Sequence, residues 1–300
     1  MRLLPYAQLL RLPNVFTAFA DILMGTLAAG TLMHRPLAAM LLLLASACLY
    51  CSGMVWNDYF DFEIDRKERP FRPLPSGRVA RSTARGLGVG LMILGLGIAG
   101  LAGWGAEGWD GRPVVLATAL VAAILFYDVW LKHTPIGPVT MGTCRFLNVL
   151  LATSLADASV LPSYQKVHLA LVVGIYIIGV TWFARGEAGQ SLSANLRGVA
   201  AVMLAALILA LAVPARLVEG SVTVAYPYLL VAFGFLIGIP IAKAIARPEA
   251  QMVQAAVKRC ILGLVVLDAI LATVYVGLPG LAIILLLPPA MLLGKRVYST

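Results

Sequence analysis

The chain has 300 residues, of which 61% are hydrophobic and 12% are charged, and its mean hydropathy is +0.91. A soluble domain is about half apolar and about a quarter charged, so this composition excludes a single water-soluble core, and it equally excludes a disordered chain. The net charge of +9 does not indicate a nucleic-acid partner, because in a membrane protein the placement of basic residues matters more than their sum.

Ten apolar segments follow one another along the chain. Several approach the roughly 20 residues that a helix needs to cross a bilayer core, so the sequence predicts an all-α polytopic membrane protein. No internal repeat, low-complexity tract or soluble domain interrupts them, and residues 1–300 are expected to form one domain. In chain order the segments cover residues 14–33, 37–56, 86–106, 113–131, 137–156, 167–184, 198–213, 224–243, 260–276 and 278–294.

The basic residues predict the orientation of these spans. With the N-terminus inside, 19 Lys and Arg residues are assigned to the inner side of the membrane and 4 to the outer side, which accounts for all 23. The tenth segment belongs to this pattern, because nine spans would leave Lys295 and Arg296 outside. By the positive-inside rule we expect an integral, multi-pass protein of a bacterial cytoplasmic membrane, with its N-terminus on the cytoplasmic side.

The longest inner loop begins with a run of carboxylates. Asp58, Asp61 and Asp65 are spaced 0, 3 and 7, and Asn57 precedes them. On a helix this spacing puts the three acids on one face, where like charges repel and favour a bound cation. Mg²⁺ takes oxygen ligands and often bridges one or two carboxylates to the phosphates of a substrate. The loop therefore predicts a Mg²⁺ site.

Arginines follow the carboxylates in the same loop, at Arg69, Arg72 and Arg78. Guanidinium groups bind phosphate oxygens through bidentate hydrogen bonds. Carboxylates followed by arginines at a membrane surface indicate a site for a metal–diphosphate head group whose apolar tail lies between the helices. The alternative is a solvated, charge-balanced loop with no ligand.

A wider pattern favours the ligand site. Residues 57–65, which read NDYFDFEID, and residues 72–78, which read RPLPSGR, resemble the first aspartate motif of the UbiA superfamily of intramembrane prenyltransferases. Residues 11–19 resemble the first helix of that family. Tyr127 and Lys132, at the end of the fourth segment, resemble its Tyr-Pro-x-x-Lys-Arg turn.

The resemblance implies a helical bundle of nine to ten transmembrane helices around a lateral cavity. It implies that a polyprenyl diphosphate binds through Mg²⁺ and that its prenyl group passes to a lipophilic acceptor, such as an aromatic one. Carried over by position, the Mg²⁺ ligands and catalytic carboxylates would be Asp58, Asp61 and Asp65. The residues that would bind or line the substrate are Asn14, Asn57, Arg72, Arg78, Tyr127 and Lys132.

The second aspartate motif of the family is depleted here. Residues 181–198 occupy its position and contain one acid, Glu187, with no aspartate. Glu187 would then be the remaining catalytic and metal-binding carboxylate of this motif. The alternative is a surface ion pair with Arg185 or Arg197.

A second departure lies in the turn after Tyr127, where Asp128 replaces the proline of the family. Asp128 is either a substitute metal ligand or the partner of Lys132 in an i,i+4 ion pair. Residues 183–187 and 142–148 resemble a divergent branch of the family found in Ebo-type metabolite gene clusters.

Further polar residues lie inside the apolar segments. An ionisable group within a membrane is costly and is a functional candidate, so we expect these residues to line the substrate cavity. The alternative is an interhelical pair, for instance of an aspartate with Arg145. The residues are Asn14, Thr17, Asp21, Arg145, Asn148 and Asp268, of which Asp21, Arg145 and Asn148 are expected to contact substrate.

Three functions remain open from the sequence. The first is Mg²⁺-dependent prenyl transfer from an isoprenoid diphosphate to a lipophilic acceptor. The second is a non-catalytic or transport protein that binds an isoprenoid diphosphate or a prenylated metabolite. The third is a terpene cyclase or diphosphate hydrolase on the same scaffold. The expected partners are the diphosphate donor, an unidentified lipophilic acceptor and membrane lipids, with no nucleic acid.

Overall fold

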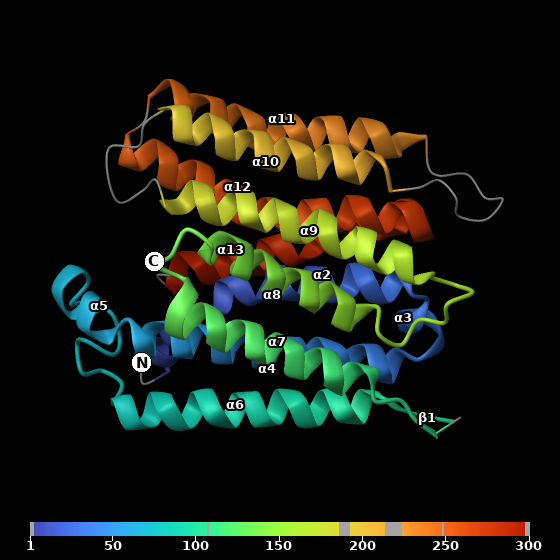
Figure 1. Ribbon diagram of the computed structural model, residues 1–300, viewed down its shortest axis with the longest axis horizontal. Helices are drawn as coiled ribbons and strands as arrows, with labels where there is room; N and C mark the ends of the chain where they lie inside the picture. The colour runs from blue at the N-terminus through green and yellow to red at the C-terminus, as the bar shows by residue number, and fades with distance from the viewer. Residues whose placement is uncertain (1–2, 107, 186–192, 214–223, 248, 298–300) are drawn as a thin grey trace.

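The structure is a computed structural model that describes residues 3–106, 108–185, 193–213, 224–247 and 249–297, with the backbone alone for residues 193–196. Nearly all of the described chain is helical, and the long helices run side by side along the length of the molecule (Figure 1). The end of the bundle that carries α5 and the N-terminus is called the α5 end below. It is the end at which the candidate site lies.

The first half of the chain forms one side of the bundle. Its helices begin where the sequence places proline, as at Pro13, Pro36 and Pro113, because proline at the first helical positions lacks only an amide hydrogen that the helix would not use. The elements are α1 (Leu4–Leu9), α2 (Leu12–Ala28), α3 (Thr31–His34), α4 (Pro36–Phe60), α5 (Phe62–Glu68), α6 (Arg81–Ala102), the hairpin β1 (Trp104–Gly105) and β2 (Gly108–Trp109), α7 (Arg112–Phe126) and the π-helical turn η1 (Tyr127–Leu131).

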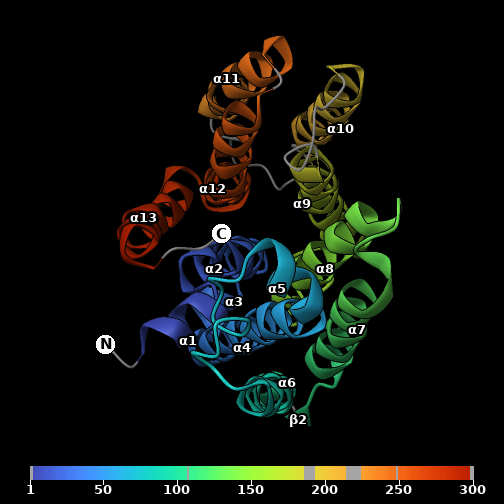
Figure 2. The same ribbon diagram turned by 90° about the vertical axis from the view of Figure 1, so that its left-hand side faces the viewer.

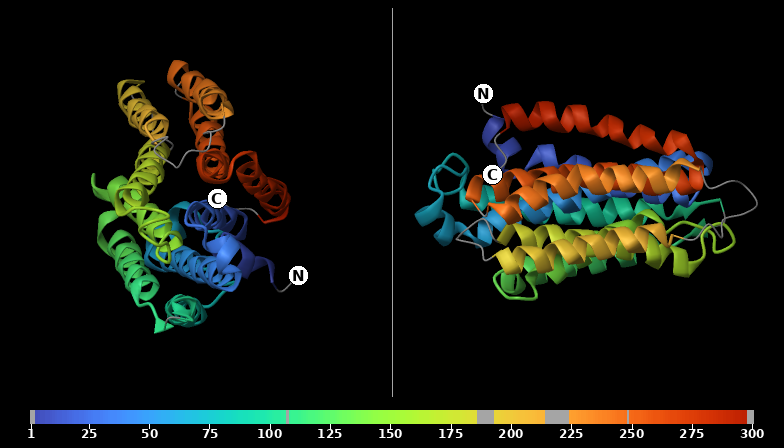
Figure 3. Two further views of the ribbon diagram at one scale, coloured as in Figure 1. Left: turned by 90° about the vertical axis from the view of Figure 1, so that its right-hand side faces the viewer. Right: turned by 90° about the horizontal axis from the view of Figure 1, so that it is seen from above.

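The second half completes the bundle on the opposite side. Figure 2 and the left-hand view of Figure 3 look along the helices and show α6 at one edge and α10 and α11 at the other. The elements are α8 (Gly137–Ala152), α9 (Ser163–Ala184), α10 (Ser193–Leu211), α11 (Ala225–Ala246), α12 (Ala250–Val276), the 3₁₀ helix η3 (Leu278–Leu286) and α13 (Leu287–Arg296).

Helix α2 is central to the packing, because it contacts α4, α8, α12 and α13. Glycine permits a close approach between α8 and α9. There a Cβ on Gly142 would lie 2.6 Å from the carbonyl oxygen of Gly174, so only glycine permits this separation. Small residues at such crossings are how membrane helices gain van der Waals contact.

Seven helices of the described chain are long and apolar enough to cross a membrane, and the helices Leu12–Ala28 and Arg197–Leu211 are shorter apolar ones. Each apolar segment expected from the sequence contains a helix, including residues 278–294, where η3 and α13 form one span. The prediction of a helical, multi-pass membrane bundle is confirmed. The lateral cavity stays a prediction.

One local prediction needs correction. The three aspartates do not lie on one uninterrupted helix, because α4 ends at Phe60 and α5 begins at Phe62. Asp61 lies between them with φ −82° and ψ 3°, and the chain bends there. The backbone hydrogen bonds still continue across the bend, from Asp61 N to Asn57 O at 3.1 Å and from Asp65 N to Asp61 O at 2.8 Å. Asp58 and Asp65 therefore stay near one another.

Candidate active site at the α5 end of the bundle

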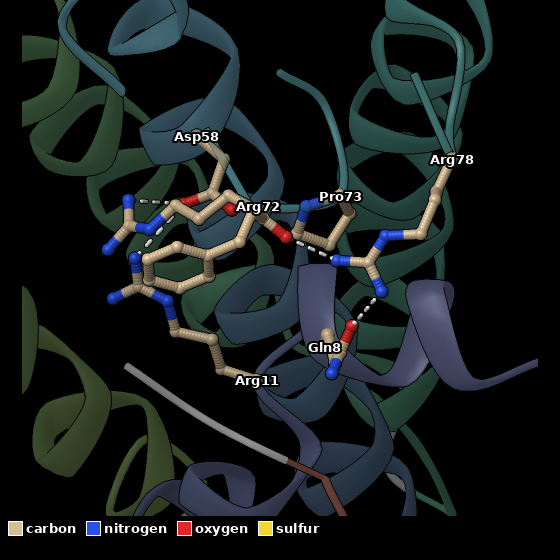
Figure 4. A pocket seen from close by; sticks show the side chains of 7 residues that line it. Gln8, Arg11, Asp58, Arg72, Pro73 and Arg78 are labelled. Carbon is tan, nitrogen blue, oxygen red and sulfur yellow. Dashed lines mark hydrogen bonds and ion pairs between the residues drawn. The ribbon is translucent and has the colours of Figure 1, made fainter. Parts of the chain in front are cut away.

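Asp58 lies in the last turn of α4 and is the meeting point of two arginines. Its Oδ1 is 3.0 Å from Arg11 Nη2 and 3.5 Å from Arg72 Nη1, and only 5% of its side chain is exposed. Figure 4 shows both guanidinium groups directed at this carboxylate. A nearly buried carboxylate needs such partners, because leaving the charge unpaired away from water is costly.

Arg11 reaches Asp58 from an unusual backbone conformation. It is the N-cap of α2 and has φ 46°, and it is the one non-glycine residue with positive φ in the described chain. Strain of this kind persists where the surroundings hold it and is frequent at functional sites. Burial by itself lowers the pKa of Arg11, but the attraction of Asp58, with smaller contributions from Tyr50 and Asp65, outweighs this and raises the pKa above its ordinary value. Arg11 is therefore a fixed positive charge.

Asp65, on α5, is held by the second of these arginines. Its Oδ2 lies 2.7 Å from Arg72 Nη1, and both side chains are almost completely buried. Burial raises the pKa of Asp65 above its ordinary value, and the neighbouring Arg72 opposes the rise without cancelling it. Arg72 thus joins the end of α4 to α5.

Asp61 has a different set of nitrogen-containing partners. Its Oδ1 lies 2.7 Å from Lys132 Nζ and 3.3 Å from His133 Nε2. Lys132 is itself nearly buried and also donates to the carbonyl oxygen of Asn57 at 3.3 Å. Asp61 is 16% exposed, which makes it the most open of the three motif aspartates.

The π-helical turn η1 explains why Lys132 meets Asp61. The amide of Lys132 donates to the carbonyl of Tyr127 at 2.9 Å, one residue further back than in an α-helix, and such wider turns are frequent at functional sites. Asp128, in the same turn, is buried and accepts from Asn57 Nδ2 at 3.1 Å. The expected ion pair of Asp128 with Lys132 is replaced by these two separate contacts to the α4 end.

Arg78 lies at the rim of the site. It donates to Ser76 Oγ and to Gln8 Oε1, each at 3.0 Å, and also to a main-chain carbonyl. With its neighbours it borders a pocket of about 350 Å³ that is partly open to solvent. Three guanidinium groups and one carboxylate border this pocket, so its walls favour an anion (Figure 4). The lining residues are Gln8, Arg11, Asp58, Phe71, Arg72, Pro73 and Arg78.

The polar residues within the apolar segments gather elsewhere, deeper in the bundle. Arg145 on α8 lies 3.0 Å from Asp21 on α2 and donates to Thr17 at 2.6 Å. Asn148 donates to the same oxygen of Asp21 at 2.9 Å. The structure therefore forms the interhelical pair that the sequence left as the alternative, and substrate contact by Asp21, Arg145 and Asn148 stays a prediction.

The remaining site residues expected from the sequence are Asn14, Tyr127 and Glu187. Asn14 hydrogen-bonds Tyr50, a ring that also lies 5.4 Å from the Arg145 guanidinium carbon. Tyr127 is half-buried in η1. Glu187 lies outside the described residues, so its metal-binding role is untested.

Sequence reasoning missed Arg11, His133 and Tyr50, although the Arg11-Leu-Pro-Asn order at the start of the first span was a signal for Arg11.

The donor chemistry of this site fits Mg²⁺. Carboxylate and amide oxygens lie on adjacent turns, and Mg²⁺ commonly binds through one or two carboxylates together with substrate phosphates. Among the residues that the structure describes, no three His, Cys, Asp or Glu side chains converge into a closed metal cage. The arrangement suits an ion that arrives with a phosphate ligand, since each motif aspartate already has a side-chain cation beside it.

The chain resembles curated archaeal enzymes over part of its length. It is 34% identical over 146 residues to the digeranylgeranylglyceryl phosphate synthase of Metallosphaera sedula, covering 48% of this chain and 49% of the relative. It is 37% identical over 124 residues to the enzyme of the same name from Methanoregula boonei, covering 41% and 40%. The similarity spans about half the length of these curated relatives or less.

Solved structures resemble the chain over nearly all of its length. A structure of digeranylgeranylglyceryl phosphate synthase in membranes has a TM-score of 0.65 and 20% identity, and the match covers 92% of this chain and 99% of that one. A UbiA homologue from Archaeoglobus fulgidus, bound to GPP and Mg²⁺, has a TM-score of 0.61 and 15% identity, covering 93% and 99%. At these identities the likeness establishes the fold.

The family itself is matched more directly. Residues 18–259, which include the carboxylates of α4 and α5, the turn η1 and the polar residues of α8, match the UbiA prenyltransferase family. The apolar helices and this match together indicate an integral membrane protein. The sequence resemblance is confirmed: the chain belongs to the UbiA prenyltransferase family.

Proposed function

We propose that this protein transfers a prenyl group from an isoprenoid diphosphate to a lipophilic acceptor within the membrane, with Mg²⁺ as cofactor. The observation that carries the proposal is the alternation of charge at the α5 end. Asp58, Asp61 and Asp65 lie within salt-bridge distance of Arg11, Arg72 and Lys132. Acids for a metal and cations for phosphate are thus placed together.

The site residues have separate proposed roles. Asp58, Asp61 and Asp65 would hold Mg²⁺, with Asn57 and Asp128 as further oxygen donors and Glu187 as the candidate from the second motif. When bound, Mg²⁺ would neutralise charge that develops on the diphosphate. Arg11, Arg72 and Lys132 would turn from the carboxylates toward phosphate oxygens, and Arg78 would bind phosphate oxygens from the rim of the pocket. This exchange of partners keeps the total charge balanced without bringing unpaired groups into a poorly solvated site.

The proposed reaction is a substitution at the first carbon of the prenyl chain. The bond from that carbon to the bridging oxygen breaks, and its electron pair leaves with the diphosphate. The acceptor forms a new bond to the same carbon and loses one proton. Arg72 and Lys132 are suited to hold the leaving diphosphate, because both cations are fixed by nearly buried contacts and need little reorganisation.

The site is proposed to face the cytoplasm of a bacterial cell. The N-terminal helix α1, the α4–α5 bend and the turn η1 lie at one end of the bundle (Figure 1). The sequence assigns 19 of the 23 Lys and Arg residues to the side of the membrane that includes these segments. The positive-inside rule assigns that end to the cytoplasmic side. Residues 1–300 are proposed to act as one domain.

The experiment uses the full chain in lipid nanodiscs. Geranylgeranyl diphosphate, Mg²⁺ and an extract of lipids and small molecules from the host cells are supplied, and diphosphate release and products are followed by mass spectrometry. Asp61→Asn removes the most open motif carboxylate. Glu63→Gln is the matched control, because Glu63 lies in the same segment but is 65% exposed and pairs only with the exposed Arg66 among the described residues.

We expect release and a prenylated product from the wild type and Glu63→Gln, and at least a tenfold loss with Asp61→Asn, the size typical for removing one electrostatic contact in a reaction. Unchanged transfer by Asp61→Asn would contradict the proposal. Mg²⁺-dependent binding without release would instead favour a carrier. Release with only prenyl alcohol or a cyclic terpene as product would favour a hydrolase or a cyclase.

A further inference from the structure

A polar cluster joins four helices inside the membrane-spanning part of the bundle. It is separate from the diphosphate site, and polar groups at this depth persist only when they are paired. We call it the inner cluster. It consists of Thr17 and Asp21 of α2, Ser46 of α4, Arg145 and Asn148 of α8, and Asp268 of α12.

One oxygen of Asp21 is fully paired. Oδ2 accepts from Arg145 Nη1 at 3.0 Å and from Asn148 Nδ2 at 2.9 Å. Asn148 in turn accepts from Ser46 Oγ at 2.7 Å. Asp21 is completely buried, so these donors take the place of water for one half of its carboxylate.

Three carboxylate oxygens of the cluster have no donor among the described residues. They are Oδ1 of Asp21 and both oxygens of Asp268. Asp268 is completely buried as well, on a helix that packs against α2, and it interacts electrostatically with Asp21 and Arg145. A buried polar atom without a partner is rare and calls for a physical reason.

Counting charges supplies the reason. If both aspartates were ionised, two negative charges would share the single guanidinium of Arg145, and Asp268 would have no donor at all. An ionised carboxylate buried in this way is strongly disfavoured. A single proton resolves the problem, because a protonated Asp268 can donate to Oδ1 of Asp21. The remaining charges of Asp21 and Arg145 then cancel.

We propose that Asp21 and Asp268 form a proton-binding site, in which one proton is held on Asp268 and shared with Asp21. Among the described residues, two tyrosines also interact with this cluster. The ring of Tyr50 lies 5.4 Å from the Arg145 guanidinium carbon, and Tyr176 of α9 donates its hydroxyl to the carbonyl of Cys260 at 2.8 Å rather than to Asp268. Asp268 is thus a positioning residue. It keeps the inner cluster neutral and holds Arg145 between α2 and the ring of Tyr50.

Infrared spectroscopy tests the proton directly, using the full chain in nanodiscs at neutral pH. The wild type minus Asp268→Asn difference spectrum should contain a protonated-carboxyl band that shifts in deuterated water. Asp21→Asn should lose the band, because Asp268 then ionises to balance the charge of Arg145. The absence of the band from the first difference spectrum, or its persistence in Asp21→Asn, would overturn the proposal.

Thermal stability provides a second test that does not depend on the proposed transfer reaction. Asp268→Asn keeps a neutral donor for Asp21, so its Tm should stay within about 2 °C of the wild type. Asp268→Leu removes that donor, and its Tm should fall by roughly 5 °C or more. If Asp268→Asn were as unstable as Asp268→Leu, the charged form of Asp268 would be the one that the fold requires, and the proton site would be excluded.

Discussion

Arg72 Nη1 lies 2.7 Å from Asp65 Oδ2, and neither side chain is more than 6% exposed. The same nitrogen is 3.5 Å from Asp58. One guanidinium therefore ties the last turn of α4 to the short helix α5 across the bend at Asp61. In the proposed reaction the same group passes to the diphosphate, so a structural contact of the ligand-free protein becomes a substrate contact.

Arg72→Lys should lower the rate of diphosphate release about tenfold or more. Lysine keeps the charge but cannot bridge two acceptors with a planar, forked set of donors. Arg69→Lys is the matched control, because Arg69 is exposed in the same loop, and its rate should stay within about twofold of wild type. Steady-state release at saturating Mg²⁺ measures both. Equal rates for the two variants would show that Arg72 has only a structural role.

Lys132→Met should raise the KM for the diphosphate donor and lower kcat. Lys132 Nζ lies 2.7 Å from Asp61 and is buried, so methionine replaces a desolvated charge by an apolar group of similar length. A loss of about 10²-fold in kcat/KM corresponds to about 2.7 kcal/mol of transition-state stabilisation. His133→Gln is the control, since His133 is 61% exposed. A larger loss of kcat/KM in His133→Gln than in Lys132→Met would show that His133, not Lys132, binds the diphosphate.

Arg11→Gly should separate activity from stability. Glycine adopts φ 46° without strain, and that relief offsets the lost ion pair with Asp58, so the free energy of unfolding should change by less than about 1 kcal/mol. Diphosphate release should nevertheless fall about tenfold, because a phosphate-binding cation is gone. Thermal melts and release assays on one preparation measure both quantities. Full activity of Arg11→Gly would show that Arg11 does not bind the diphosphate.

Gly142→Ala should destabilise the bundle by about 1–3 kcal/mol through overpacking. The added Cβ would lie 2.5 Å from Ile178 Cγ1 and 2.6 Å from the carbonyl of Gly174, and α8 would have to move away from α9. Gly90→Ala is the control, because nothing lies within 4 Å of its Cβ position, and alanine there should be neutral or stabilising by about 0.5–1 kcal/mol. Thermal melts in nanodiscs check the pair, and similar Tm values would show that the helices adjust freely.

Much of the fold could be predicted from hydropathy, because membrane helices must be long and apolar. Proline marks several helix starts in the structure, as at Pro36. The break at Asp61 and the π-helical turn at Tyr127 were not predicted, since both depend on how the helix end packs rather than on residue type.

The candidate site was predictable in part. The spacing of Asp58, Asp61 and Asp65 indicated a metal–diphosphate site, and the structure places cations beside each of them. Their partners were not predictable, because Arg11 comes from a segment 47 residues away and Lys132 from another helix. The interaction between Asp21 and Asp268 likewise joins helices that are far apart in the sequence, and no local pattern encodes it.

The most direct test of the central claim is the metal dependence of diphosphate release by the full chain in nanodiscs. The protein is first treated with EDTA, and Mg²⁺ is then restored stepwise in the presence of geranylgeranyl diphosphate and the host extract. The account predicts no release in EDTA, saturable recovery for the wild type and Glu63→Gln, and at least a tenfold weaker recovery for Asp61→Asn. Release that persists in EDTA, or that recovers equally in Asp61→Asn, would contradict it.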